Sequence, residues 1–163
     1  MRKTLSDWGV IAEIISAVAV TLSLVFVGLQ IRDNTIASQA ATYQASVAYD
    51  IELLTSISAS PETAQIYDSF RRDASDGLDA GESLQALFLF TAVFRHLENI
   101  YLQYKLGMLS DESWKTREAL LAGLVKSPGY EKFAASIQWQ LFSGAFVDYV
   151  TQIRSDQENN PID

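Results

Sequence analysis

The chain of 163 residues has no cysteine, one histidine and three prolines. Without cysteine it cannot form disulfides, zinc–thiolate sites, iron–sulfur clusters or thiol nucleophiles. The single histidine, His96, excludes a metal site built from several histidines. Basic residues are also scarce, with 12 Lys and Arg against 20 Asp and Glu. Because nucleic-acid phosphates are bound by clustered Lys and Arg, this balance argues against a nucleic-acid partner.

Apolar residues are plentiful, at 48% of the chain, and mean hydropathy is +0.07 despite a net charge of −8. This content argues against intrinsic disorder. Apolar residues are most concentrated in residues 10–29, whose only charged residue is Glu13. Twenty helical residues span about 30 Å, the thickness of the hydrocarbon core of a bilayer. We therefore expect one transmembrane helix in contact with membrane lipid; a cleaved signal peptide and a buried helix of a soluble protein are the alternatives.

The charges around the apolar segment bear on its orientation. Arg2 and Lys3 precede the segment, and only Arg32 follows it within 20 residues, so the positive-inside rule favours a cytoplasmic N-terminus. Three charges of each sign lie before Asn34, so the entire net −8 belongs to residues 34–163. An acidic surface of this kind disfavours close contact with anionic lipid.

The pattern of helix-starting and helix-breaking residues predicts an all-α fold. Nothing interrupts the helix between Gln30 and Asn34, so one helix should run over about residues 6–58. Ser60 and Pro61 are typical of an N-cap and first helical position, and Gly107 is typical of a helix end. The further helices expected are 61–73, 79–106, one that follows the N-cap Ser110 and ends at Leu124 or Val125, and about 130–155.

These elements divide the chain into four parts. Residues 1–33 would form an N-terminal tail and the transmembrane helix, and residues 34–58 a helical extension or stalk. Residues 59–155 would form a small helical bundle, and residues 156–163 a frayed tail.

Small and polar residues repeat every seven positions along the apolar segment. We define the seam as the set Gly9, Ala12, Glu13, Ser16, Ala19, Val20, Ser23, Val27 and Gln30. The row of Gly9, Ser16, Ser23 and Gln30 continues beyond the segment at Ala37, Gln44 and Ile51. The row of Glu13, Val20 and Val27 continues at Ala41 and Ala48. A seven-residue repeat stays on one helix face in a left-handed supercoil, and small residues let helices approach closely in lipid. The pattern predicts helix–helix association, in a homo-oligomer or with another protein. Incidental small residues without self-association are a further alternative.

A pore is the alternative interpretation of the same seam. Three or more copies around an axis would direct Glu13, Ser16, Ser23 and Gln30 towards a channel, where a ring of Glu13 would attract cations. Val20 and Val27 would then form hydrophobic constrictions. Ions are partners of the protein only under this alternative.

The densest polar cluster outside the seam is residues 95–99. Arg95 and Glu98 are three positions apart and can pair on one helix face, whereas His96 and Glu98 face different sides. We interpret the cluster as a structural ion pair, with a ligand or catalytic site as the alternative. Phosphate loops, dinucleotide fingerprints and nucleophile elbows do not occur in the sequence. We therefore predict a protein that is not an enzyme and needs no cofactor. An enzyme with an unmarked site in the helical bundle is the alternative.

The resemblance of this chain to a known group of proteins rests on several segments. They are residues 8–13, which place an acidic residue in the apolar segment, residues 29–35 (LQIRDNT), residues 40–44 (AATYQ), and residues 95–101 (RHLENIY) followed by Gly107. The chain resembles a widespread group of uncharacterised bacterial proteins with one N-terminal span and a small helical domain. The resemblance implies a plasma-membrane location but transfers no catalytic or binding residue. That group commonly has basic residues after the Asn-Thr pair, which implies a cytoplasmic C-terminal domain. Ile36, Ser38 and Gln39 stand there in this chain.

Overall fold

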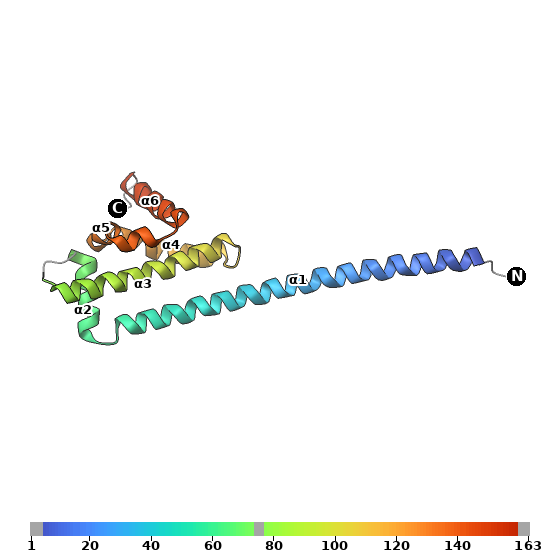
Figure 1. Ribbon diagram of the computed structural model, residues 1–163, viewed down its shortest axis with the longest axis horizontal. Helices are drawn as coiled ribbons and strands as arrows, with labels where there is room; N and C mark the ends of the chain where they lie inside the picture. Colours follow the sequence, from blue (N-terminus) through green and yellow to red (C-terminus); the bar gives the residue numbers. More distant parts are fainter. Residues whose placement is uncertain (1–4, 74–76, 160–163) are drawn as a thin grey trace. The chain divides into compact units, whose positions relative to one another are not determined.

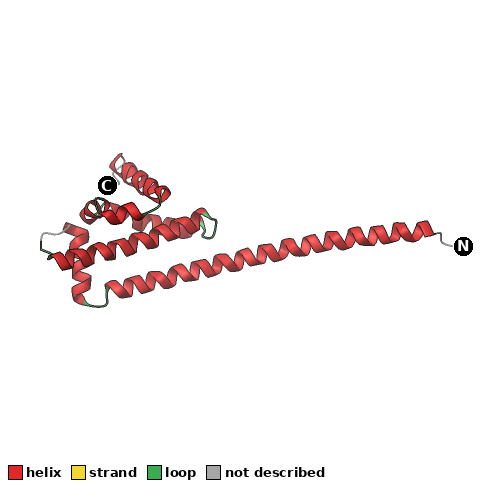
Figure 2. Cartoon of the chain, in the orientation of Figure 1, coloured by secondary structure: helices red, strands yellow, loops and turns green. Residues whose placement is uncertain are grey.

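A computed structural model describes residues 5–73 and 77–159 of the chain. All regular structure in these residues is helical, which confirms the all-α prediction (Figures 1 and 2). The elements are α1 (Leu5–Ile57), α2 (Pro61–Asp73), α3 (Ala80–Lys105), α4 (Asp111–Val125), α5 (Pro128–Ala134), the 3₁₀ helix η1 (Ile137–Leu141) and α6 (Gly144–Asn159).

The chain divides into two compact units, an N-terminal unit (Met1–Ala41) and a helical unit (Thr42–Asp163). The helix α1 contributes to both. Its C-terminal turns belong to the helical unit because Ser46 is buried there and Leu53 and Ile57 pack against its core. The sequence placed the start of the bundle at residue 59. The difference arises because Ser46 is buried and Leu53 and Ile57 are partly buried against the core, tertiary contacts that the spacing of residues in the sequence does not show.

The starts of three helices follow the capping residues in the sequence. The Ser60 hydroxyl accepts a hydrogen bond from the Thr63 N–H at 3.1 Å, ahead of Pro61 at the first helical position of α2. The Ser110 hydroxyl accepts from the Ser113 N–H at the start of α4. At the start of α3, the Asp79 carboxylate and the Glu82 side chain form a reciprocal capping box. Side-chain caps therefore account for these helix boundaries.

The end of α3 depends on a glycine. Gly107 has φ +73°, in the left-handed region that glycine adopts without steric cost. Its N–H donates to the Tyr104 carbonyl, and the Met108 N–H donates to the Gln103 carbonyl, both at 2.9 Å. This pair of bonds is a Schellman motif, and it confirms Gly107 as the end of the predicted helix.

The single helix predicted over about residues 130–155 is wrong. This stretch contains α5, the 3₁₀ helix η1 and α6, and α6 extends to Asn159. The interruption lets Trp139 and Phe142 turn their rings towards Phe133, at centroid distances of 5.4 and 5.9 Å. The Ser143 N–H bonds to the Glu98 carboxylate instead of to a helix carbonyl. Tertiary packing ends the helix here, and no proline marks the position.

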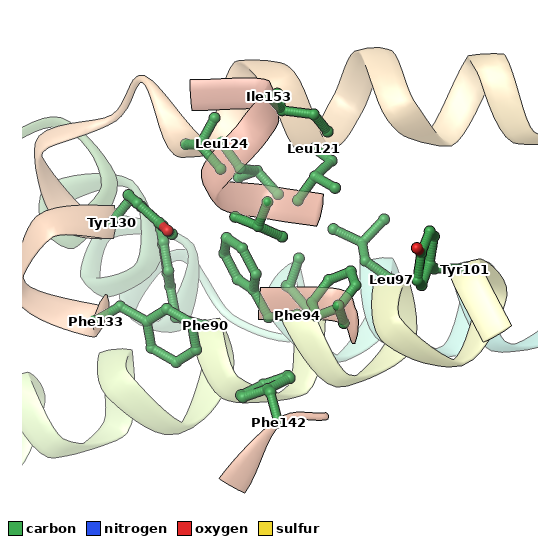
Figure 3. Close-up of a cluster of buried hydrophobic side chains, with 14 of the residues drawn as sticks. Phe90, Phe94, Leu97, Tyr101, Leu121, Leu124, Tyr130, Phe133, Phe142 and Ile153 are labelled. Atoms are coloured by element: carbon green, nitrogen blue, oxygen red, sulfur yellow. The ribbon is translucent and has the colours of Figure 1, made fainter. Parts of the chain in front are cut away.

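The core of the helical unit is built around α3 and is rich in aromatic rings. Phe90, Phe94, Leu97 and Ile100 of α3 are almost fully buried. Phe133 from α5 lies 4.8 Å from Phe94 between ring centroids (Figure 3). The remaining core side chains labelled in Figure 3 come from α3 to α6 and from the segment before α6: Tyr101, Leu121, Leu124, Tyr130, Phe142 and Ile153. Burial of rings and aliphatic groups on this scale is the main stabilising contribution to the unit.

Candidate functional site

The first candidate site is the exposed apolar part of α1. It contains an 18-residue window with mean hydropathy 2.5, of which no part is buried, and it is long and apolar enough to cross a membrane. A core helix of a soluble protein would be mostly buried, so that alternative does not describe this segment. We call residues 10–29 the span.

The structure places every residue of the seam on α1, and all of them are exposed: Gly9, Ala12, Glu13, Ser16, Ala19, Val20, Ser23, Val27 and Gln30. The Ser23 hydroxyl donates to the Ala19 carbonyl at 2.9 Å, so its proton is satisfied within the helix. Glu13 is the one ionisable residue of the span. A single chain therefore leaves the whole seam available for contact.

The second candidate site lies in the helical unit and centres on Asp50 of α1. Its Oδ1 lies 2.7 Å from Nε2 of His96 on α3, and its Oδ2 accepts a hydrogen bond from Nη2 of Arg117 on α4. A carboxylate paired with a guanidinium accepts hydrogen bonds only, so Nε2 of His96 carries the proton in this contact. The ring of Tyr49 stacks on the imidazole at a centroid distance of 4.5 Å. The His96 side chain is only 5% exposed, so this is a shielded polar cluster.

Arg95 and Glu98 form the ion pair that the sequence predicted, with Nη1 of Arg95 2.7 Å from Oε2 of Glu98. The second oxygen of Glu98 accepts from the Ser143 N–H at 2.7 Å, and Nη2 of Arg95 donates to the Leu141 carbonyl. Burial alone raises the pKa of Glu98, but the Ser143 N–H and the Arg95 guanidinium outweigh it and hold this pKa below its usual value. The pair thereby fixes the chain between η1 and α6 against α3.

A third polar group joins α4 to α6. The Tyr149 hydroxyl donates to the Glu118 carboxylate, and Nε1 of Trp114 donates to the same hydroxyl at 3.3 Å. Burial and the adjacent carboxylate both raise the pKa of Tyr149 well above its usual value. This group has the geometry of a structural contact.

Two recesses in the helical unit share His96. The first, of about 450 Å³, is lined mostly by polar side chains of α1 and α3: Thr42, Ala45, Ser46, Tyr49, Arg95, His96, Asn99, Ile100 and Gln103, with Leu109. The second, of about 400 Å³, has mainly aliphatic walls from α1, α3 and α4 together with Tyr67 of α2. Its other polar residues are Asp50, His96, Thr116 and Arg117. We call them the polar recess and the apolar recess.

The chain matches no protein-family model, no curated protein and no solved structure. The function of the two candidate sites is therefore argued from their own chemistry. In the part of the chain that the structure describes, no group of three His, Asp or Glu side chains is placed to hold a metal ion.

Sequence reasoning found the Arg95–Glu98 pair but missed the partners of His96. Asp50 is 46 positions before His96 and 67 before Arg117, so no local spacing connects them. One signal was available, since Asp50 is the only charged residue between Asn34 and Ile51. A lone charge in an otherwise uncharged stretch of helix indicates a specific partner.

Proposed function

We propose that this chain is a single-pass membrane protein whose span self-associates through the seam and holds the helical unit at the membrane. The observation that carries the proposal is the exposed apolar window of α1, none of which is buried by the rest of the chain. Such a surface is stable in contact with lipid, because all backbone polar groups within the helix are already paired. No catalytic step is assigned to the chain in this proposal.

The composition of the seam supports self-association. Glycine, alanine and serine allow two helix backbones to approach closely in lipid, where van der Waals contact replaces the hydrophobic effect as the driving force. The same heptad row reaches Gln44 and Ile51 of the helical unit, and Ile51 is 60% exposed. Residues 34–49 carry no charge, so two copies of an acidic chain can align there without repulsion.

Membrane insertion is tested by expressing the full chain and extracting the membranes with alkaline carbonate. The protein should remain in the membrane pellet and keep its intact N-terminal mass. Release into the supernatant would contradict insertion, and loss of the N-terminal residues would identify a cleaved signal peptide. Native mass spectrometry in detergent then tests association, because a strict monomer would contradict self-association through the seam.

The proposed location is a bacterial plasma membrane with the helical unit in the cytoplasm. The resemblance described above supports this side, and the charges flanking the span favour the other. The chain has no native cysteine, so Gln152→Cys at an exposed position of α6 reports orientation directly. A membrane-impermeant maleimide should label it only after spheroplasts are lysed. Labelling of intact spheroplasts would place the helical unit outside.

Ion conduction by the same assembly is the second candidate function. It is favoured by Glu13, an exposed ionisable residue on the seam within an otherwise uncharged span. An intramembrane carboxylate is costly unless it faces water or a partner. Liposomes carrying the wild-type oligomer should pass cations, and Glu13→Gln should reduce the flux. Absence of flux from a confirmed wild-type oligomer rejects conduction and leaves self-association intact.

A further inference from the structure

The apolar recess reaches from exposed side chains down to residues of the hydrophobic core. Val93, Leu97 and Leu124 line it although each is at most 6% exposed. Leu54 and Leu120 also line it, but they are 66% and 54% exposed, so they lie at its mouth. Protein interiors are packed as densely as organic crystals, and a gap of about 400 Å³ beside core residues is far larger than such packing leaves. These walls are apolar surface that the chain itself does not cover.

The charged side chains of the apolar recess compensate one another. Asp50 and Arg117 form an ion pair, and Nε2 of His96 lies against the same carboxylate. Among the described residues, no other Asp, Glu, Lys or Arg lines the recess. A charged ligand would therefore bring an uncompensated charge against aliphatic walls, which is costly. The lining favours a ligand without charge.

Arg117 keeps unused hydrogen-bond donors at the polar end of the recess. A guanidinium has five N–H groups, and within the described chain Arg117 makes one hydrogen bond, from Nη2 to Asp50. Its side chain is only 16% exposed, so water has limited access to the remaining N–H groups. Because shielded donors without a partner are unfavourable, an oxygen acceptor on the ligand would be stabilising here.

We propose that the apolar recess binds a small uncharged aliphatic molecule that carries a hydroxyl or carbonyl oxygen. Its aliphatic body lies on Leu53, Leu97 and Leu124, and its oxygen accepts a hydrogen bond from Arg117. Recesses of about 300–1,000 Å³ with apolar walls and a few polar groups are typical of small-molecule sites. All the lining residues belong to the helical unit, so the proposal does not depend on membrane insertion or on self-association.

The test is photolabelling of the full chain in lipid nanodiscs with an octanol that carries a diazirine group, followed by peptide mass spectrometry. Label should appear on Leu53, Leu54 or Leu120, should saturate with probe concentration, and should be displaced by excess octanol. Octanoate has the same chain length and a carboxylate, and at equal free concentration it should displace the probe at least about tenfold less effectively.

Three results of this experiment would overturn the proposal. The first is label confined to the span, where lipid-dissolved probe reacts without saturation. The second is label at the recess that octanol does not displace, or that octanoate displaces equally well. The third is protection of the recess residues in an oligomer, which would place a second copy over the mouth instead.

Variants at the mouth locate the ligand without disturbing the contacts of Asp50. The double variant Leu54→Gln, Leu120→Gln exchanges two exposed apolar side chains for polar ones and should weaken probe binding at least about tenfold, measured by the label on Leu53. Leu84→Gln, Leu106→Gln is the matched control, because these leucines are 51% and 69% exposed and do not line the recess. Unchanged labelling of the first variant, or equal loss in the control, would overturn the assignment to this recess.

Discussion

Asp50 on α1 contacts His96 on α3 through one carboxylate oxygen and Arg117 on α4 through the other. One side chain near the end of the long helix thereby fixes three helices of the helical unit. His96 and Arg117 are shielded, with side chains 5% and 16% exposed, while Asp50 is 31% exposed. Removal of the carboxylate leaves two polar partners without their acceptor.

The substitution Asp50→Ala should lower the free energy of unfolding by about 2–3 kcal/mol, below the range for fully buried pairs because Asp50 is partly exposed. Urea unfolding of the full chain in detergent, followed by tryptophan fluorescence, measures this value. Glu52→Ala is the matched control, because Glu52 is exposed on α1 two positions away, and its effect should stay within about 0.5 kcal/mol. Equal effects of the two substitutions would contradict a stabilising role for the contacts of Asp50 with His96 and Arg117.

Glycine at position 129 is required by a close approach between α5 and α2. A Cβ built on Gly129 would lie 2.3 Å from the Phe70 carbonyl oxygen, a backbone atom that cannot move alone. Gly129→Ala should therefore destabilise the helical unit by about 1–3 kcal/mol through overpacking.

At Gly123, in the neighbouring helix α4, we expect a substitution by alanine to have the opposite effect on stability. No atom lies within 4 Å of a Cβ built at this position. Gly123→Ala should raise the free energy of unfolding by about 0.5–1 kcal/mol, because alanine loses less backbone entropy in a helix. The same urea titration compares both variants, and a stabilising Gly129→Ala would show that α2 and α5 do not approach as described.

Glu98 should make the helical unit sensitive to acid. Its pKa in the folded protein lies below the ordinary glutamate value of 4.5, so the folded state favours the ionised carboxylate. The stabilisation that the ionised Glu98 carboxylate gives the folded state is complete above pH 4.5. It declines as the pH falls below that value and is lost below the folded pKa. Glu98→Gln should be less stable at neutral pH and should show a shallower loss of stability on acidification. Parallel stability curves for wild type and variant between pH 3 and 7 would contradict the lowered pKa.

Tyr149 should make the same unit sensitive to alkali. Its folded pKa lies above the ordinary tyrosine value of 10.0, so stability is complete below pH 10 and declines as the pH rises towards the folded pKa. Tyr149→Phe keeps the ring but removes the ionisable group and the hydrogen bond to Glu118. The variant should be less stable at pH 8, by about 1 kcal/mol, and its stability should fall less between pH 9 and 11. An identical loss of stability at alkaline pH in the wild type and the variant would contradict the raised pKa of Tyr149.

Local signals in the sequence were sufficient for much of the fold. The caps at Ser60 and Ser110 and the left-handed Gly107 set helix boundaries through contacts within a few residues, so spacing alone predicted them. The Arg95–Glu98 pair was predictable for the same reason.

Contacts between distant segments could not be predicted in this way. The break at η1 depends on Trp139 and Phe142 packing on Phe133, and on the Ser143 N–H reaching Glu98. The Asp50–His96 contact crosses 46 positions and depends on how α1 and α3 pack. These features follow from tertiary packing, which a periodic pattern in a single helix does not contain.

Self-association through the seam is tested most directly by disulfide crosslinking, because the chain has no native cysteine. Ser16→Cys and Ser23→Cys lie on one row of the seam, and Val18→Cys and Val25→Cys lie seven residues apart on the opposite face of the same exposed helix. On oxidation in native membranes, the two serine positions should form disulfide-linked dimers and the two valine positions should not. Equal crosslinking at all four positions, or none at any of them, would contradict an interface at the seam.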